Sequence, residues 1–236
     1  MDSGAVHVWS ADVEIGERAA SRLAPLLSPE EKARAGRYKS KSRAAQFIVA
    51  RGLLRRILGE ITGVPPSDLR FTTNEHGKPT FAEDEINLHF NVAHSESVAL
   101  IAITRVGPVG VDIEAIRTIS NIERLARRWF SDEDFQYIMH ADTSNQDARF
   151  FRLWTRKEAL LKAWGVGLSW ESSRAVNVLN DCVGHPPPDV PGGPARPWGN
   201  EPKWSIRSWS HASKYVAAVA APGESWRLEF HKAPSF

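Results

Sequence analysis

The strongest constraint on the fold is a helix-forming segment at residues 149–165, R-F-F-R-L-W-T-R-K-E-A-L-L-K-A-W-G. It contains no proline and no internal glycine and is rich in strong helix formers, so it predicts a helix that ends at Gly165. On a wheel with 100° per residue, its large apolar residues share one broad face that needs a core to pack against. This face consists of Phe150, Leu153, Trp154, Leu160, Leu161 and Trp164.

Three charged residues of this segment stand on or beside the apolar face. Glu158 and Lys162 lie one turn apart on its flank. Such a pair is most often a solvent-exposed salt bridge, and that interpretation stays open, but the adjacent aromatic residues favour the rim of a site. Lys157 falls near the middle of the face, so either its stem carries the charge to solvent or its ammonium has a buried acceptor.

A second short segment, V-G-V-D-I-E at residues 109–114, alternates as a strand does, so Asp112 and Glu114 share one face. Side chains two apart on a strand are ~7 Å apart at the backbone. Two carboxylates at that separation repel by ~2 kcal/mol at an effective dielectric constant of about 20, so a buried strand that carries both needs a positive partner. Oxygen ligands alone favour Mg²⁺ or Mn²⁺. The alternative is an edge strand with one face in water.

Length and composition describe an ordinary globular chain. Its 236 residues allow one large domain or two intimate lobes, and we expect lobes at residues 1–110 and 111–236. A formal net charge of +2 is too small to indicate nucleic acid, and the single cysteine excludes an internal disulfide framework. The N-terminus lacks a signal-peptide pattern and no apolar run is long enough for a membrane span, so we expect a cytoplasmic protein.

The remaining patterns predict alternating helices and strands. Helices are expected to begin at Ser28, with the capping sequence S-P-E-E, at Ala44, and after Ser131. Strands are expected at residues 6–9, 69–73, 79–81, 98–103, 203–209 and 215–221. The turn R-V-G-P joins the strand at 98–103 to the segment that carries Asp112, and we expect these two strands to be antiparallel neighbours. The proline-rich residues 183–202 predict a mobile surface loop.

The two halves of the chain show a faint echo of each other. S-P-E-E and a helix that ends L-L-R-R-I-L-G reappear as S-D-E-D and a helix that ends L-L-K-A-W-G. H-S-E-S-V-A-L-I-A-I likewise reappears as H-A-S-K-Y-V-A-A-V-A. A duplicated α+β unit would place a ligand cleft between its two copies, and a monomer could then form a complete cleft.

Three motifs carry a resemblance to a known family: F-N-V-A-H-S, V-G-V-D-I-E and W-T-R-K-E-A-L-L-K-A-W-G, supported by S-P-E-E-K-A-R and G-K-P. In this order and spacing they resemble the 4′-phosphopantetheinyl transferases of the surfactin-synthetase-activating type, from about residue 9 to residue 220. The resemblance implies two pseudo-symmetric α+β lobes, each a small, mostly antiparallel sheet packed with helices, with coenzyme A between them. It also implies Mg²⁺-dependent attack by a serine of an apo acyl or peptidyl carrier protein on the β-phosphate of coenzyme A, which releases 3′,5′-ADP.

The resemblance further implies roles for individual residues. Asp112, Glu114 and Glu158 would hold Mg²⁺, Lys162 would reach the pyrophosphate, and Glu158 is the candidate base. The catalytic set would be Glu158, Lys162 and Asp112. Contacts to coenzyme A would come from Arg34 at the 3′-phosphate, Gly77, Lys78 and Pro79 at the adenine, Asn91, His94 at the phosphates, and Lys162.

Two residues depart from the family pattern. Ala93 stands where many relatives have serine, which removes one phosphate donor. Glu31 stands where some have lysine, so the 3′-phosphate would rest on Arg34 with help from Arg43 or Arg51.

Other functions remain open from the residues alone. A Mg²⁺-dependent phosphohydrolase or nucleotidyl transferase would use the same carboxylates without a carrier-protein acceptor. A basic module that binds nucleic acid or acidic proteins would need the basic run after Ser28 to dominate, and the small net charge argues against it. A lone histidine such as His94 is also more often an ordinary core or surface residue than a ligand.

Overall fold

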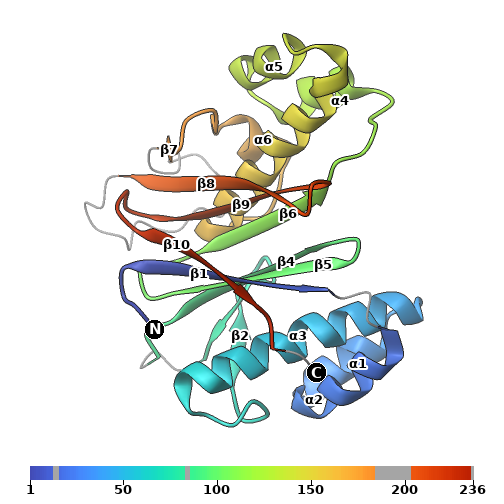
Figure 1. The fold of residues 1–236 in the computed structure, drawn as a ribbon, viewed down its shortest axis with the longest axis vertical. Helices are drawn as coiled ribbons and strands as arrows, with labels where there is room; N and C mark the ends of the chain where they lie inside the picture. Colours follow the sequence, from blue (N-terminus) through green and yellow to red (C-terminus); the bar gives the residue numbers. More distant parts are fainter. Residues whose placement is uncertain (13–15, 83–85, 184–202, 235–236) are drawn as a thin grey trace.

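Two four-stranded sheets face each other at the centre of the molecule, and helices cover the outer side of each sheet (Figure 1). The computed structural model describes residues 1–12, 16–82, 86–183 and 203–234. These layers confirm the expected α+β fold with two lobes. Nearly all of the loop expected at residues 183–202 lies outside the described residues. None of the described helices combines the length and the apolar character needed to cross a bilayer.

The first lobe is built from the N-terminal elements. In chain order they are β1 (Ala5–Asp12), α1 (Gly16–Leu23), a 3-10 turn (Ala24–Leu26), α2 (Pro29–Gly36), α3 (Lys41–Thr62), β2 (Phe71–Thr73), β3 (Pro79–Phe81), β4 (His89–Ser95) and β5 (Val98–Thr104). The capping box expected at the start of α2 is present: the Ser28 hydroxyl accepts from the Glu31 N–H and the Glu31 carboxylate accepts from the Ser28 N–H. The sequence therefore located this helix start correctly.

The second lobe follows. Its elements are β6 (Gly110–Ala115), α4 (Ile122–Trp129), α5 (Asp132–Met139), α6 (Thr143–Trp164), α7 (Trp170–Arg174), β7 (Cys182–Val183), β8 (Trp204–His211) and β9 (Tyr215–Pro222). The expected helix ends at Gly165, which takes the left-handed conformation with φ 76°. It begins earlier than expected, at Thr143, because the polar turn before Arg149 continues the helix.

The two lobes share one connectivity. In the first, β1 pairs with β5 and β5 with β4; in the second, β6 pairs with β9 and β9 with β8, and all four pairings are antiparallel. A helix of 22 residues stands between the first and second strand of each set, α3 in one lobe and α6 in the other. The faint sequence echo therefore reflects a repeated α+β unit.

The end of the chain returns to the first lobe. A strand that the sequence analysis missed, β10 (Arg227–Lys232), runs parallel to β1 and forms the edge of the first sheet. Its alternation R-L-E-F-H-K is weak in apolar residues, which is typical of an edge strand. Residues 227–232 thus belong to the first sheet, although they were expected in the second lobe. For the other elements, the expected lobe boundary at residue 110 stays a prediction.

The expected pairing of the Asp112 strand with residues 98–103 is wrong. β6 pairs with β9, where Asp112 lies opposite Ala218, whereas β5 lies between β1 and β4. The reason is that Val109, Val111 and Ile113 form an apolar row that packs against the first sheet, so β6 stacks on that sheet. A strand can cover a sheet face in this way only if its hydrogen bonds go to a different sheet.

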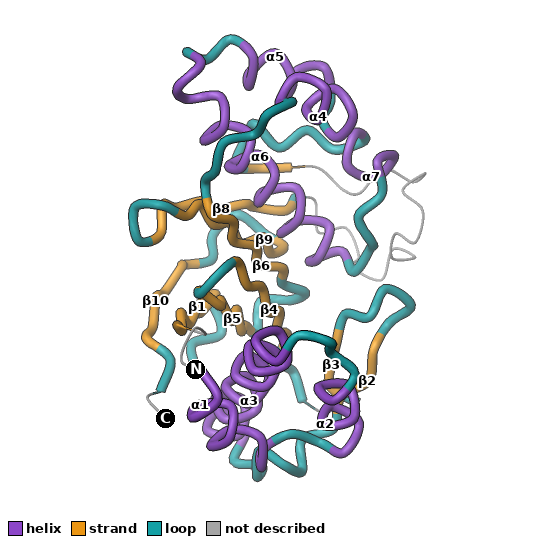
Figure 2. The backbone as a smooth tube through the Cα atoms, turned by 90° about the vertical axis from the view of Figure 1, so that its right-hand side faces the viewer, coloured by secondary structure: helices purple, strands orange, loops and turns teal. Residues whose placement is uncertain are grey.

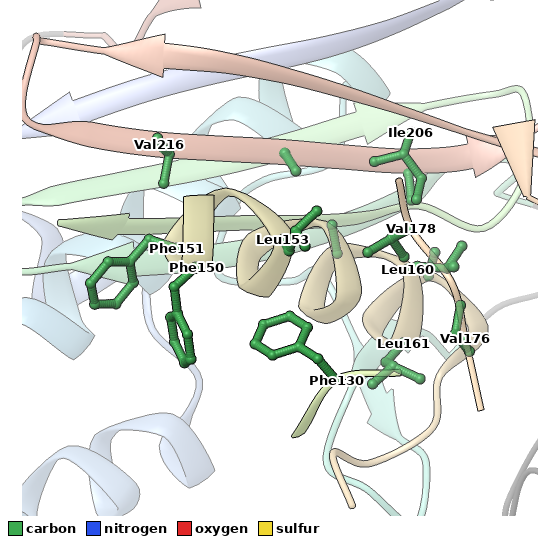
Figure 3. Close-up of a cluster of buried hydrophobic side chains, with 14 of the residues drawn as sticks. Phe130, Phe150, Phe151, Leu153, Leu160, Leu161, Val176, Val178, Ile206 and Val216 are labelled. Carbon is green, nitrogen blue, oxygen red and sulfur yellow. The ribbon is translucent and has the colours of Figure 1, made fainter. Parts of the chain in front are cut away.

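Three apolar cores hold the four layers together. One lies between the helices and sheet of the first lobe, one between the two sheets, and one between the second sheet and α6. Figure 3 shows the third, in which Phe130, Phe150, Leu153 and Leu160 pack around α6. The apolar face predicted for this helix is therefore buried, except that Trp154 is only partly buried.

Lys157 lies within this third core and has buried acceptors. Its ammonium is 2.7 Å from the carboxylate of Asp134, and it donates to the carbonyls of Ser173 and Val176. Both charged side chains are almost fully buried. Of the two alternatives that the sequence left open for Lys157, the buried acceptor is the correct one.

Gly110 lets β6 touch α6 backbone to backbone. A Cβ atom at this position would lie 1.9 Å from the carbonyl oxygen of Ala159 and 2.4 Å from the nitrogen of Ala163. Any other residue would force strand and helix apart, because backbone atoms cannot move aside as a flexible side chain can. This contact brings Asp112, two residues along β6, next to the helix that carries Glu158 and Lys162.

Gly110→Ala is therefore expected to destabilise the protein. Inserting a methyl group into a packed core typically costs ~1–3 kcal/mol, and we expect the upper end of this range or more, since both neighbours are main-chain atoms. Urea unfolding followed by circular dichroism measures the change. Gly36→Ala is the matched control, because a Cβ there meets nothing within 4 Å. Equal unfolding midpoints for the two variants would contradict the proposed packing role.

Candidate active site

A cavity of about 510 Å³ opens between the two lobes. Its lining comes from α2, α3, the β2–β3 turn, β4, β6 and α6. Most of the residues proposed from the sequence line it: Arg34, Gly77, Pro79, Asn91, His94, Asp112, Glu114, Glu158 and Lys162. Arg34 and Lys162, which are 128 positions apart in the chain, thus line the same cavity.

An ion pair joins β6 to α6 at one end of the cavity. The Lys162 Nζ atom is 2.6 Å from Asp112 Oδ1. The residue Asp112 is only 6% exposed, and its second oxygen, Oδ2, has no hydrogen-bond partner within the described parts of the chain. A buried carboxylate oxygen without a donor is costly, so this atom is suited to accept a ligand.

The electrostatics of this cluster favour an added cation. Burial raises the pKa of Asp112 from 3.8 to about 7, and Glu158 and Glu114 add to the rise against the opposing effect of Lys162. Burial also raises the pKa of Glu158, and Glu114 again contributes. Burial disfavours the Lys162 ammonium, but Asp112 and Glu158 outweigh it and raise the pKa of Lys162. Asp112, Glu114 and Glu158 all act on Lys162, and these three carboxylates outnumber the two cations of the cluster, Lys162 and the Arg117 that contacts Glu114.

Glu114 is held in place from both sides. Its carboxylate accepts a hydrogen bond of 3.1 Å from the Ser95 hydroxyl and contacts Arg117 at 3.3 Å. The same Ser95 hydroxyl accepts from the N–H of Ala115, so the last residue of β4 fixes the end of β6. With Asp112 and Glu158, this residue completes an oxygen-only set that could hold a divalent cation.

The opposite side of the cavity is basic. Arg34 lines it with its guanidinium 5.2 Å from the centre of the Phe47 ring, and Arg51 lines it from α3. Glu31 pairs with Arg51 at 3.1 Å and with the buried Arg55 at 2.6 Å. Glu31 therefore offsets part of the positive charge here.

Arg51 lines the cavity beside Arg34, whereas Arg43, the other helper considered for the 3′-phosphate, is not among the lining residues. Of the two arginines considered, Arg51 is the one that lines the cavity together with Arg34.

Gly77 and Pro79 of the G-K-P turn line the cavity, and the lysine between them is not among the lining residues. Figure 2 shows the β2–β3 hairpin beside α2, with its turn directed towards the end of α6. The Asn74 amide donates to the carbonyl of Gly165, and Lys78 Nζ donates to the carbonyls of Val109 and Ala163 at 3.1 Å each. Lys78 thus ties the hairpin to the second lobe, and burial lowers its pKa to about 8.

Asn91 lines the cavity and also connects the lobes. Its side-chain oxygen accepts a hydrogen bond of 2.9 Å from the N–H of Val111. Because Val111 precedes Asp112, this bond fixes the position of the Asp112–Lys162 ion pair relative to β4. His94, three positions further along β4, is exposed and also lines the cavity.

Sequence reasoning missed several lining residues, among them Tyr38, Phe47 and Trp154. Trp154 could have been found, because it lies one turn before Glu158 on the ridge that continues to Lys162. Tyr38 and Phe47 gave no signal, since their place depends on how α2 and α3 pack. Ser95 was visible only as part of a family motif, and its bond to Glu114 depends on the stacking of β6 on β4.

The pKa shift of Asp112 predicts a pH effect on stability. A folded-state pKa above the unfolded value means that protonation favours the folded state, so this contribution is present at acidic pH and is lost as the pH rises through about 7. Asp112→Asn removes it. In metal-free buffer, the unfolding free energy of the variant minus that of the wild type should increase from about pH 5 to about pH 8. The exposed Asp68→Asn serves as control, and parallel profiles for Asp112→Asn and wild type would contradict the assignment.

Comparison with known proteins identifies the family of the chain. Family models match residues 16–105, as "4′-phosphopantetheinyl transferase, N-terminal", and residues 108–220, as "4′-phosphopantetheinyl transferase superfamily". The 4′-phosphopantetheinyl transferase HetI of Nostoc sp. is 33% identical over 230 residues, which cover 97% of this chain and 92% of that protein. The 4′-phosphopantetheinyl transferase Sfp of Bacillus subtilis is 31% identical over 158 residues, 67% of this chain and 69% of that protein. The chain therefore belongs to the 4′-phosphopantetheinyl transferases, as its motifs indicated.

Proposed function

We propose that this protein transfers the 4′-phosphopantetheine group of coenzyme A to a serine of an apo acyl or peptidyl carrier protein. The observation that carries the proposal is the convergence of Asp112, Glu114, Glu158 and Lys162 in one inter-lobe cavity, opposite Arg34, in a member of this family. A cavity of about 510 Å³ is within the size range of small-molecule sites. It is anionic at one end and cationic at the other, which suits a ligand with a diphosphate and a separate phosphate.

The acidic end is proposed to hold Mg²⁺, or Mn²⁺, through Asp112, Glu114 and Glu158. The residues fit such an ion, since all are oxygen donors and Asp112 Oδ2 has no partner among the described residues. When bound, the ion supplies charge neutralisation at the diphosphate. Lys162 lies beside the same carboxylates and would donate to the diphosphate as well.

The basic end is proposed to bind the 3′-phosphate of coenzyme A through Arg34, assisted by Arg51. Gly77 and Pro79 would border the adenine with the backbone of Lys78, and His94 and Asn91 would complete the phosphate contacts. Because Glu31 already pairs with Arg51, the full charge of only one of these two arginines is available.

The chemistry proposed is a substitution at phosphorus. The serine oxygen forms a bond to the β-phosphorus, the bond from that phosphorus to the bridging oxygen breaks, and 3′,5′-ADP leaves. Glu158 is the proposed base for the serine proton, because its raised pKa makes it a better proton acceptor than an ordinary carboxylate. A Glu158 oxygen that binds the ion cannot take the proton at the same time, so the two roles need its two oxygens.

We also propose that the protein acts as a monomer, because the two lobes of one chain form the cavity without a partner. A cytoplasmic location is proposed from the single, free and exposed Cys182, which is typical of a reducing compartment.

Incubation with coenzyme A, Mg²⁺ and a panel of apo carrier proteins tests the function. Mass spectrometry should show a ~340 Da increment on at least one carrier, as the chemistry requires. Glu158→Gln and Asp112→Ala should each reduce the rate ~100-fold or more with the fold intact, because each removes charge stabilisation at the reacting centre. Glu171→Gln, an exposed change in the same lobe, is the control.

The same assay separates the alternative function. A phosphohydrolase or nucleotidyl transferase would consume coenzyme A or a nucleotide with no carrier present. That result, without any increment on a carrier, would contradict the proposal. Near-normal rates in both Glu158→Gln and Asp112→Ala would contradict the roles proposed for these two residues but not the proposed function.

Mg²⁺ binding should release protons near neutral pH. Asp112 has a pKa of about 7, so part of the metal-free protein carries a proton there, and the ion must displace it. Calorimetry in two buffers with different ionisation enthalpies should give different apparent binding enthalpies, and affinity should rise between about pH 6 and about pH 8. Asp112→Asn should abolish both effects. Identical enthalpies for the wild type in the two buffers would count against the cluster as the metal site.

A further inference from the structure

A second group of potential ligands lies where the first and last strands meet. His7 on β1 and Glu229 and His231 on β10 stand on one face of the parallel pair, with His7 opposite Glu229 and Trp9 opposite His231. The His7 Nδ1 atom is 2.9 Å from His231 Nε2 and 3.3 Å from Glu229 Oε2. One ligand atom from each of the three residues lies within 4.8 Å of the other two.

The surroundings hold these rings in a form that can bind a metal. The His231 ring stacks on Trp9 with centroids 4.7 Å apart, which fixes its orientation. His7 is 6% exposed, and its other nitrogen, Nε2, has no hydrogen-bond partner in the described structure, so all its polar contacts pass through Nδ1. Burial lowers the pKa of His7, against the effect of Glu229, and a neutral imidazole is the form that ligates metals.

We propose that His7, Glu229 and His231 form a Zn²⁺ site with water as a further ligand. Two imidazoles and one carboxylate are a donor set that Zn²⁺ accepts and that Mg²⁺ does not favour. Ligands at ~2.0–2.1 Å in tetrahedral geometry are ~3.3 Å apart, close to two of the separations found here. The remaining adjustment falls on Glu229, whose side chain is 40% exposed and free to turn.

This site would act on stability and not on catalysis. None of its three residues lines the inter-lobe cavity. A metal here would link β1 to β10, the two strands nearest the chain ends, and would bind only the folded protein, so it should raise the melting temperature. The proposal is independent of the proposed transferase reaction.

The competing description is a metal-free cluster in which one imidazole donates to the other and Glu229 accepts. It explains the same distances but gives no Zn²⁺ affinity above that of scattered surface histidines. The two descriptions therefore differ in one measurable quantity.

The test uses the full chain, without a polyhistidine tag and freed of metal with a chelator. Competition with a chromophoric chelator should show one Zn²⁺ per chain, and Co²⁺ should give the visible absorption of a tetrahedral site. Glu229→Gln and His231→Phe, which keeps the stacking on Trp9, should each weaken Zn²⁺ binding at least ~10-fold, since even indirect metal-site changes cost 10- to 100-fold.

His211→Phe is the matched control, because His211 lies on β8 and contacts Tyr215 outside the cluster. It should leave Zn²⁺ affinity and the Zn²⁺-dependent rise in melting temperature unchanged, and all three variants should retain enzymatic activity. Absence of Zn²⁺ binding by the wild type, or undiminished binding in both Glu229→Gln and His231→Phe, would overturn the proposal.

Discussion

The contact between β6 and α6 is the constraint on which the rest of the molecule depends. Gly110 allows the two backbones to touch, and the Asp112–Lys162 ion pair forms next to that contact. A wider gap between strand and helix would leave the sheets stacked but would separate the carboxylates of β6 from those of α6. The presence of glycine at position 110 therefore determines whether the carboxylates of β6 and α6 can lie next to each other.

The cluster that results is not optimised for stability. Three carboxylates are partly withdrawn from water, and the pKa of Asp112 is raised first by its burial and then by the nearby charges of Glu158 and Glu114. Elsewhere the same helix pairs its buried charges fully: Lys157 has Asp134, and Arg156 reaches Asp181 at 2.9 Å. In the cavity, by contrast, carboxylates outnumber cations, and a bound cation would change that balance.

The sequence predicted well the parts of the fold that local rules govern. Helix caps at Ser28 and Ser131, the stop at Gly165 and the two faces of β6 depend on neighbouring residues alone. It failed where distant segments decide: β6 pairs with β9 and not with β5, and β10 joins β1 from the far end of the chain. Lining residues such as Phe47 were missed for the same reason, while motif positions such as Asp112 and Glu158 were found by resemblance.

The return of β10 to the first sheet has a mechanical consequence. The chain passes from one lobe to the other between β5 and β6 and comes back between β9 and β10, and the two crossings lie side by side, since a Cβ atom at Gly107 would be 2.7 Å from the Pro222 side chain. Two adjacent crossings could act as one hinge, but the apolar core between the two sheets also joins the lobes, with Leu100 and Ala102 on one side and Val111 and Ile113 on the other. Because this core packs the lobes together without a ligand, little binding energy has to be spent on drawing the cavity walls together.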